Sequence, residues 1–381
     1  MTKMQIPFFR NTYTDYDLVY TSEVIKRGMY WANGPEIINF ENELAKIAGT
    51  KYALCFNSGT SAGFALLSCL DLNRDDEIII PSFTFIATAN WCVMANAKPV
   101  FADIELSTYG LDPDSIRGQI TPNTKVIMPV HVGGMPCQID EILNICEEFG
   151  LILIEDAAES LFSEHDGKKV GSFGLASVFS FTPTKLVSTG EGGAIVTNSK
   201  NLYESLKLFR SHGRAETSDY FNSNEFMDYI SLGHNLRMPS IIAAQGIAQL
   251  QNIDYIVHRR LEIAERYDKG FSNNKHISVQ NTYKNKLNTY QMYMINIKSS
   301  EGNRDELMHY LNENGIMSKV YFHPVHKSTH FRKLGFSKVS LPKTEQLSQS
   351  ILSLPIYPSM SNEEIDFIID KVNNFVHEAN Q

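Results

Sequence analysis

The chain has 381 residues, enough for one large domain and a smaller one, and its 43% hydrophobic and 20% charged residues are ordinary for a soluble globular protein. The formal net charge of −9 at pH 7 argues against a nucleic-acid-binding surface. No apolar run approaches membrane-spanning length, and the N-terminus lacks the apolar segment of a signal peptide. The five cysteines include no Cys-x-x-Cys pair, so we expect a reduced protein of the cytoplasm that contacts no membrane.

Short apolar runs alternate with helical patterns through the first two thirds of the chain. We expect helices at 61–70, 87–97 and around 142–149, and strands at 52–56, 77–81, 99–103, 125–130, 151–154 and 176–181. Continuous apolar strands that are separated by helices predict an α/β fold with a mainly parallel sheet, covered by helices on both faces.

The pattern changes after about residue 259, where strands and helices become fewer and more polar. We expect a long helix at 249–267, ordered segments at 290–297, 305–314 and 319–322, and a final helix at 363–375. These features predict a smaller α+β domain at the C-terminal end. The predicted division is a large domain at 1–255 and a small domain at 256–381.

Polar residues collect where the predicted strands end. The strand at 52–56 leads into Asn-Ser-Gly-Thr, the strand at 77–81 into Ser-Phe-Thr-Phe, and the strand at 125–130 into His-Val-Gly-Gly. The last two strands lead into Asp156 and Lys185. Because ligands of open parallel sheets sit beyond the carboxyl ends of the strands, these residues are predicted to converge on one site.

Lys185 and Asp156 together indicate a pyridoxal phosphate (PLP) site. In such sites a lysine holds the cofactor as a Schiff base, and an acidic residue pairs with the pyridine nitrogen. A carboxylate that closes an apolar strand needs a partner to offset its desolvation, and a pyridinium N–H would be one. The alternatives are a solvated lysine and an aspartate that caps a helix or forms a salt bridge.

A phosphate site is predicted at 58–60, where Ser58, Gly59 and Thr60 open a helix directly after a strand. Helix N-termini offer free N–H groups and the positive end of the helix dipole, although a simple N-cap would have the same sequence. Ser180, five residues before Lys185, is placed to reach the same phosphate. Phe85 is interpreted either as a ring that stacks on the cofactor or as a core residue.

Two other patterns are discounted. His323, His326 and His330 have spacing that resembles a metal site, but no carboxylate or cysteine nearby completes a ligand set, so no metal is predicted. The glycine-rich turn at 189–193 lacks the Gly-Lys-Ser/Thr ending of a P-loop.

Taken in order, these motifs resemble the DegT/DnrJ family of PLP-dependent nucleotide-sugar aminotransferases, nearly from end to end. The resemblance implies the aspartate aminotransferase type I fold with a sheet of the seven-stranded type. The matching segments are 57–60, 81–85, 129–131, 155–158, 180–185, 189–193, 235–238 and 354–358.

The resemblance implies a role for individual residues. Lys185 would hold PLP, Asp156 would bind the pyridine nitrogen, and Phe85 would stack on the ring. The implied phosphate ligands and remaining cofactor contacts are Ser58, Gly59, Thr60, Ser180 and Glu159, together with Asn235 from the neighbouring subunit of a homodimer. Substrate contacts are implied for Tyr321, His323, Glu191 and Arg237.

The chain departs from the family pattern at three positions near the implied site. Glu159 stands where many members have Gln, Thr182 replaces a common His, and Gln291 replaces a common His before Tyr293. These departures concern the identity of the substrate rather than the basic chemistry.

The implied reaction moves an amino group from L-glutamate, which becomes 2-oxoglutarate, to a nucleotide-diphosphate keto sugar at C3 or C4. The cofactor would alternate between PLP and pyridoxamine phosphate, and the product would be an amino sugar for surface glycans or natural products. Two alternatives are a PLP-dependent sugar dehydratase and a non-catalytic PLP- or sugar-binding regulatory protein. Dehydratases of this kind carry His in place of the lysine, so Lys185 disfavours the first.

Overall fold

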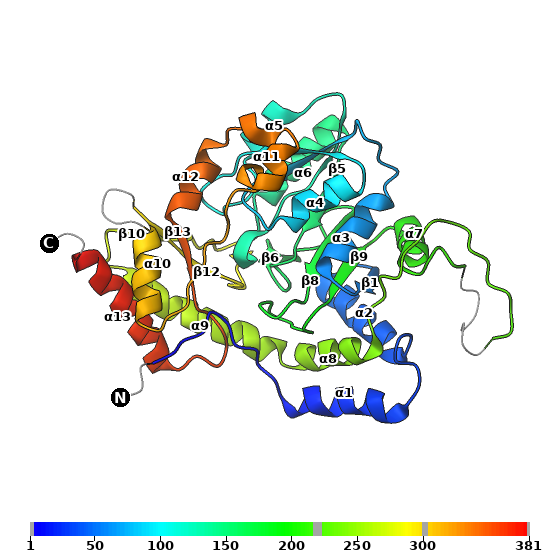
Figure 1. The fold of residues 1–381 in the computed structure, drawn as a ribbon, viewed down its shortest axis with the longest axis horizontal. Helices are drawn as coiled ribbons and strands as arrows, with labels where there is room; N and C mark the ends of the chain where they lie inside the picture. The colour runs from blue at the N-terminus through cyan, green and yellow to red at the C-terminus, as the bar shows by residue number, and fades with distance from the viewer. Residues whose placement is uncertain (1–3, 216–222, 299–303, 379–381) are drawn as a thin grey trace.

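The computed structural model describes residues 4–215, 223–298 and 304–378, and its centre is a seven-stranded sheet (Figure 1). The spatial order of the strands is β1-β9-β8-β5-β4-β2-β3. Their bounds are β1 (Tyr52–Phe56), β2 (Glu77–Pro81), β3 (Lys98–Ala102), β4 (Thr124–Ile127), β5 (Ile152–Asp156), β8 (Ala176–Ser180) and β9 (Gly193–Thr197).

Six strands of this sheet run in one direction, and β9 runs antiparallel to both of its neighbours, β1 and β8. The prediction of a mainly parallel sheet is therefore confirmed. Strand β9 was not expected, because Gly193 was assigned to a glycine-rich turn. In the structure Gly193 is already the first residue of the strand, and the β-branched Ile195, Val196 and Thr197 continue it.

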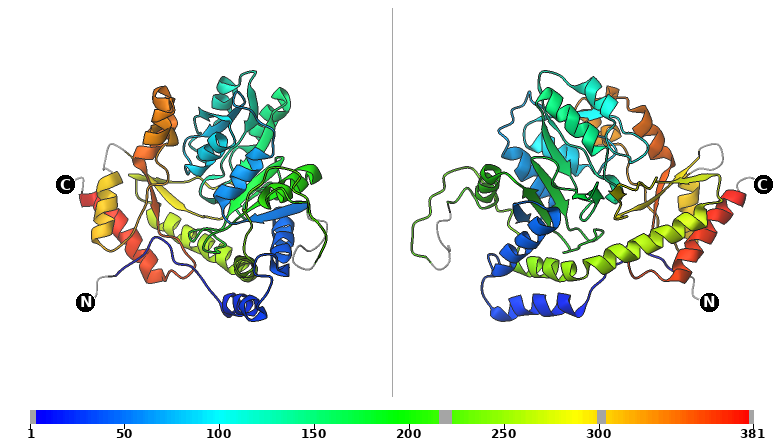
Figure 2. Two further views of the ribbon diagram at one scale, coloured as in Figure 1. Left: turned by 45° about the vertical axis from the view of Figure 1, so that its right-hand side comes forward. Right: turned by 180° about the vertical axis from the view of Figure 1, so that it is seen from behind.

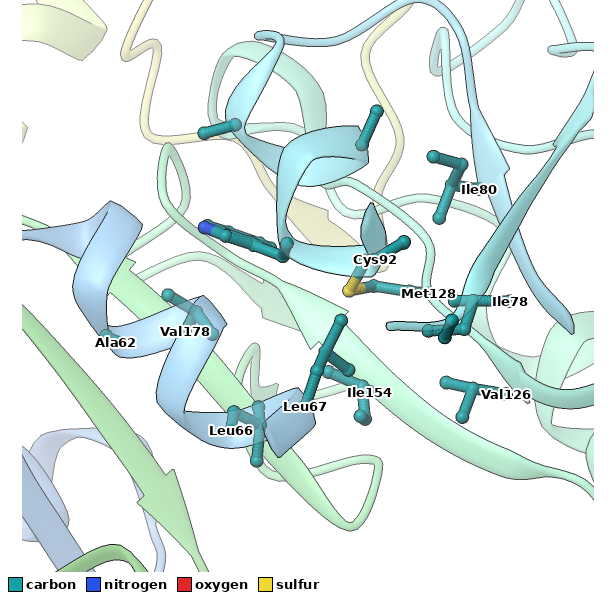
Figure 3. Packing of buried hydrophobic residues seen from close by; sticks show 14 of the residues in the cluster. Ala62, Leu66, Leu67, Ile78, Ile80, Cys92, Val126, Met128, Ile154 and Val178 are labelled. Carbon is teal, nitrogen blue, oxygen red and sulfur yellow. The ribbon is translucent and has the colours of Figure 1, made fainter. Parts of the chain in front are cut away.

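Helices cover both faces of the sheet. Alternate residues of each strand point to opposite sides, and because the strands are apolar on both sides, each face needs a cover. Ile78 and Ile80 join one hydrophobic core with α3 and α4, whereas Ile79 joins another with α5 and α6. Figure 3 shows the first core, where Leu66 and Leu67 lie close to the strands. The helices around the sheet are α2 (Pro35–Ala48), α3 (Gly59–Ser68), α4 (Ala87–Met94), α5 (Pro113–Gln119), α6 (Ile139–Phe149), α7 (Lys200–Arg210) and α8 (Ser240–Gln251).

The C-terminal part is built on a small antiparallel sheet of order β10-β12-β13. Its strands and helices enclose a separate hydrophobic core, which Ile6 from the N-terminal segment also joins. The expected smaller α+β unit is present, while the division at 255/256 stays a prediction. Its elements are α9 (Ile253–Phe271), β10 (Ile277–Val279), β12 (Tyr293–Ile297), α10 (Arg304–Glu313), β13 (Ile351–Leu354) and α13 (Asn362–Glu378).

The prediction of one continuous helix at 249–267 is wrong, because the helical segment is longer and is interrupted. The chain instead forms two helices, α8 and α9, which meet at Asn252 and lie end to end beneath the main sheet (Figure 2). The segment at 319–322 forms no strand, and Lys319 makes only an isolated bridge with Ser353 of β13.

Several shorter elements complete the fold. Helix α1 (Asp15–Arg27) packs against α8 at the outer edge of the molecule (Figure 1). The remaining elements are β6 (Glu164–His165), β7 (Lys168–Lys169), β11 (Lys286–Leu287), α11 (Thr329–Lys333), α12 (Pro342–Ser350), and 3-10 turns at Val132–Gly134, Val325–Lys327 and Phe336–Lys338. Among the described residues, none of the helices combines the length and apolar character needed to cross a bilayer.

Candidate active site

A cavity of about 210 Å³ opens at the carboxyl ends of β1, β2, β5 and β8. It collects residues from strand exits that are far apart in the sequence, as the convergence of these exits predicted. Ten of the predicted site residues line it: Ser58, Gly59, Thr60, Phe85, Asp156, Glu159, Ser180, Lys185, Glu191 and Tyr321.

Asp156 ends β5 and is 3% exposed, so its carboxylate is held almost entirely by protein groups. The Thr88 hydroxyl donates to Oδ2 at 2.7 Å, and the Ala158 N–H donates to Oδ1 at 3.1 Å. Burial raises the pKa of Asp156, and the carboxylate of Glu159 raises it further, while Thr88, Ala158 and Lys185 oppose the rise. The carboxylate is thus desolvated, and a further cationic partner would stabilise its charged form.

Lys185 lies in the loop that follows β8, and its Nζ is 3.4 Å from Oε1 of Glu159. The other carboxylate oxygen of Glu159 accepts the Gly133 N–H at 2.9 Å. Both side chains are largely buried, at 14% and 7% side-chain exposure for Lys185 and Glu159. The amine therefore faces the cavity beside a carboxylate that a second loop holds in place.

The neighbouring residue Glu155 points the other way. Its Oε2 accepts the Gly171 N–H at 2.8 Å and pairs with His131 Nε2 at 3.2 Å. Since His131 Nδ1 accepts the Cys137 N–H at 3.1 Å, the ring carries its hydrogen on Nε2 and donates it to Glu155. This fully buried network supports the loops behind the site, so of the consecutive pair Glu155 and Asp156 only Asp156 lines the cavity.

The N-terminus of α3 forms another wall of the cavity. Ser58 is the N-cap, and its hydroxyl oxygen and carbonyl accept the N–H groups of Ser61 and Ala62. The N–H groups of Gly59 and Thr60 have no acceptor within the helix, as in any first helical turn. A Cβ on Gly59 would lie 3.0 Å from the Ser180 Cβ, so glycine permits the close approach of α3 to the end of β8.

Phe85 follows β2 and lines the cavity, and 60% of its surface is exposed. The alternative, that Phe85 is a core residue, is therefore excluded, while the predicted stacking stays a prediction. The neighbouring Phe83, by contrast, is fully buried. An exposed aromatic ring at the cavity is available to a flat ligand.

Tyr321 lines the cavity together with Lys185 and Glu159, and burial and the Glu159 carboxylate both raise its pKa. The other predicted residues lie farther out. In the described part of the chain, His323, Asn235 and Arg237 are not among the residues that line the cavity. Asn235 and His323 are exposed, and Arg237 pairs with Phe56 at the end of β1.

His326, which was discounted as a metal ligand, joins two distant parts of the chain. Its backbone N–H donates to Ser82 Oγ at 3.1 Å, and the Ser82 hydroxyl donates back to Nδ1 at 2.7 Å. The Nε2 atom then faces Glu345 Oε1 at 3.3 Å. The ring thus holds the C-terminal segment against the exit of β2.

The sequence analysis did not predict the roles of two residues that contact the candidate site residues. Thr88 orients Asp156 and also contacts the Thr84 hydroxyl at 2.9 Å. Gln291 was noted only as a departure from the family pattern, yet its side chain contacts the backbone on both sides of Lys185. The third departure, Thr182, lines the cavity.

The mixed sheet, with a lysine and a buried aspartate at the exits of two adjacent strands that line one cavity, defines an α/β protein with a candidate active site at the carboxyl edge of its sheet. The chain belongs to the DegT/DnrJ/EryC1/StrS aminotransferase family, whose model matches residues 14–373. It is therefore an enzyme, an aminotransferase of this family.

Individual relatives agree with this assignment. The chain is 34% identical over 370 residues to GDP-perosamine synthase of Escherichia coli O157:H7, covering 97% of this chain and 98% of the relative. The structure matches Helicobacter pylori PseC, an aminotransferase involved in the biosynthesis of pseudoaminic acid, with a TM-score of 0.93, 29% identity, and coverage of 98% and 100% of the two chains. It also matches the PLP form of Spr1654 from Streptococcus pneumoniae, with a TM-score of 0.92, 25% identity, and coverage of 99% and 100%.

Proposed function

We propose that the protein binds pyridoxal phosphate covalently at Lys185 and transfers an amino group from L-glutamate to a keto sugar linked to a nucleoside diphosphate. The observation that carries this proposal is the placement of Lys185 and Asp156 at adjacent strand exits of one cavity, opposite the N-terminus of α3. When bound, PLP supplies an aldehyde that receives the amino group and a ring that accepts the electron pair released at the reacting carbon.

The protein groups around the cavity fit each part of this cofactor. Gly59 and Thr60 offer N–H groups at a helix N-terminus, and the Ser180 hydroxyl lies beside them, which suits a phosphate. Asp156 is buried with a raised pKa and has lone pairs left for a ring N–H, whose positive charge would offset its desolvation. The exposed ring of Phe85 suits a stacked aromatic.

Lys185 has two tasks in this scheme. Its amine would anchor the cofactor, and once the amino donor had taken that place, the free Nζ would act as the base and then the acid that carries a proton from the donor carbon. Glu159 lies 3.4 Å from Nζ and keeps the amine directed into the cavity. The Asp156 carboxylate would stabilise a positive charge on the ring nitrogen.

We propose two half-reactions at this one site, with pyridoxamine phosphate as the form that carries the amino group between them. The names of the relatives support a sugar acceptor, because GDP-perosamine synthase is named for a nucleotide-linked sugar. Glu191 and Tyr321 line the cavity and are the proposed substrate contacts within one chain. His323 and Arg237 would contact substrate only outside this cavity.

A homodimer with shared sites is part of the proposal. Apolar side chains are exposed on α1, including Leu18 at 61%, and beyond α7, where Phe226 is 86% and Leu232 81% exposed. Large contiguous patches of such side chains mark surfaces that a partner covers, and we propose that these residues belong to one. Asn235 lies three residues after Leu232 and is exposed. If a second copy of the chain covers this surface, Asn235 can contact the cofactor of that copy.

Mixing two inactive variants tests this sharing. Lys185→Ala and Asn235→Ala chains, unfolded together and refolded, should regain activity in mixed dimers, because one site then combines the intact Lys185 and the intact Asn235. A monomer in sedimentation velocity, or no recovery on mixing, would contradict the shared site.

The experiment that tests the function is the visible spectrum of the protein with added PLP, before and after L-glutamate, beside Lys185→Ala. The wild-type protein should show a band near the absorption of a protein-bound imine that glutamate bleaches, and the variant should not show this reversible change. A panel of nucleotide-linked sugars with a keto group at C3 or C4 then identifies the acceptor.

Initial rates with both substrates varied should give parallel double-reciprocal lines, as expected when one site serves them in turn. Intersecting lines would contradict the two half-reactions. A PLP band that no amino donor changes would contradict aminotransfer itself.

A further inference from the structure

Gln291 lies just before β12 and is 5% exposed, more than a hundred residues along the chain from Lys185. Its Oε1 accepts the Leu186 N–H at 3.0 Å, across a separation of 105 residues. Its Nε2 donates to the carbonyl oxygen of Thr184. The two ends of one side-chain amide therefore bind the residues immediately before and after Lys185.

This arrangement fixes the backbone of Lys185 itself. The Thr184 carbonyl belongs to the peptide plane that precedes Lys185, and the Leu186 N–H belongs to the plane that follows it. Because peptide planes are rigid, the orientation of these two planes sets the two backbone dihedrals of Lys185. A single amide that bonds to both planes thus determines the direction in which the lysine side chain leaves the chain.

Gln291 is itself held from behind. The Arg260 guanidinium, buried in α9, donates to the carbonyl oxygens of Tyr290 at 2.8 Å and Gln291 at 3.3 Å. The next residue, Met292, donates its N–H to the carbonyl of Gly133 at 3.1 Å.

This last contact reaches the carboxylate beside the lysine. The Gly133 N–H is the donor that holds Glu159. Of these consecutive residues, Gln291 therefore contacts the loop that carries the amine, and Met292 contacts the loop whose N–H holds the carboxylate of Glu159.

We propose that Gln291 is a positioning residue for Lys185, and that it directs the amine so that it attacks the cofactor aldehyde. This inference rests on the proposed function, since it concerns the anchoring step. In that step the Lys185 nitrogen adds to the aldehyde carbon, a C=N bond forms, and water leaves. The residue does not touch the cofactor, so it should affect how fast the bond forms far more than how tightly the ring and phosphate are held.

The test compares Gln291→Met, which keeps the length but removes both hydrogen bonds, with Gln280→Met as a matched control. Gln280 is also a buried glutamine whose amide makes two hydrogen bonds, to Thr108 and Asn288, and neither reaches the lysine loop. Stopped-flow absorbance measures the rate at which PLP added to the cofactor-free protein forms the C=N bond. Calorimetric titration with pyridoxamine phosphate, which has no aldehyde, measures binding without that bond.

We expect Gln291→Met to slow bond formation about tenfold or more, the effect of losing two hydrogen bonds to the lysine loop. Its affinity for pyridoxamine phosphate should stay within about threefold of wild type, and Gln280→Met should leave both quantities near wild type. If Gln291→Met does not fold, Gln291→Glu decides the question. It keeps the acceptor for the Leu186 N–H and loses the donor to the Thr184 carbonyl, and it should slow bond formation relative to wild type with little change in pyridoxamine phosphate affinity.

Equal losses of rate and affinity, or an unchanged rate, would overturn this inference while leaving the proposed function intact. A wild-type protein that forms no C=N bond with PLP would overturn the proposed function and this inference with it.

Discussion

Gly193 permits a backbone contact on which the proposed phosphate site depends. A Cβ at this position would lie 2.4 Å from the Gly59 nitrogen, and 2.5 Å from both the Gly59 Cα and the Ser58 carbonyl carbon. These are backbone atoms, so Gly193→Ala forces the N-terminus of α3 away by about 1 Å to restore ordinary contact distances. Overpacking of this kind costs about 1–3 kcal/mol of stability.

The displacement also changes cofactor binding in a specific way. A hydrogen bond of ordinary length is lost when its donor moves by about 1 Å, and a bond to a charged group contributes about 1.5–3 kcal/mol. Gly193→Ala should therefore weaken pyridoxamine phosphate binding roughly tenfold to a hundredfold. Pyridoxamine, which lacks the phosphate, should bind the variant and the wild type equally weakly.

Calorimetric titration with both ligands, together with thermal unfolding, checks this reasoning. Gly118→Ala is the control, because a Cβ on this helical glycine meets nothing within 4 Å and should not weaken binding. Equal weakening of both ligands by Gly193→Ala would mean that the whole cavity had collapsed. Unchanged pyridoxamine phosphate binding in a folded Gly193→Ala protein would refute the placement of the phosphate at α3.

Three further predictions concern single side chains. Thr88→Val removes a donor to the Asp156 carboxylate and so should raise the pKa of Asp156 further. The acid limb of the kcat/KM profile should then move to higher pH. Thr344→Val is the control, because this hydroxyl donates to another buried aspartate, and it should leave the acid limb in place. Phe85→Ala should weaken pyridoxamine phosphate binding by about 0.5–1.5 kcal/mol in calorimetry, with little loss in thermal stability because the ring is exposed; unchanged affinity would contradict stacking. Burial lowers the pKa of His326 in the folded protein, so the unfolded state binds a proton more readily. The free energy of unfolding should therefore be highest above about pH 6.5 and should fall as the pH drops below that value. Urea unfolding at two pH values should show a smaller fall in the free energy of unfolding for His326→Asn than for wild type. An equal fall would show that His326 does not cause this pH dependence.

Much of the main sheet was predictable because its signal is local. Runs such as Ile78-Ile79-Ile80 are apolar on both faces, and such strands occur where helices cover a sheet on both sides. The polar residues after these strands follow from the same pattern, so the positions of Asp156 and Lys185 were predicted together. The errors occurred where the local signal was weak. Asn252 has a low helix propensity and lies between the apolar helix α8 and the amphipathic helix α9, and Gly193 is compatible with both a turn and a strand.

The residues that orient the site were not predictable in the same way. The hydrogen bond from Thr88 to Asp156 spans 68 residues, and that from Leu186 to Gln291 spans 105. Such contacts depend on the relative placement of a helix and two strands, to which hydrophobic periodicity is insensitive. A threonine and a glutamine also have ordinary structural roles, and only the partners given by the fold distinguish these two.

These contacts also bear on the predicted division of the chain near residue 255. Gln291 binds the backbone around Lys185, Met292 binds the loop that holds Glu159, and His326 is hydrogen-bonded to Ser82 at the exit of β2. A large domain folded without the C-terminal part would retain the lysine, the aspartate and the phosphate-binding helix. It would lack Gln291, which bonds to the backbone on both sides of Lys185, and Met292, which bonds to the loop that holds Glu159. The C-terminal part therefore contributes to the candidate active site, because the Gln291 side chain bonds to both peptide planes of Lys185, and we infer that it orients the amine.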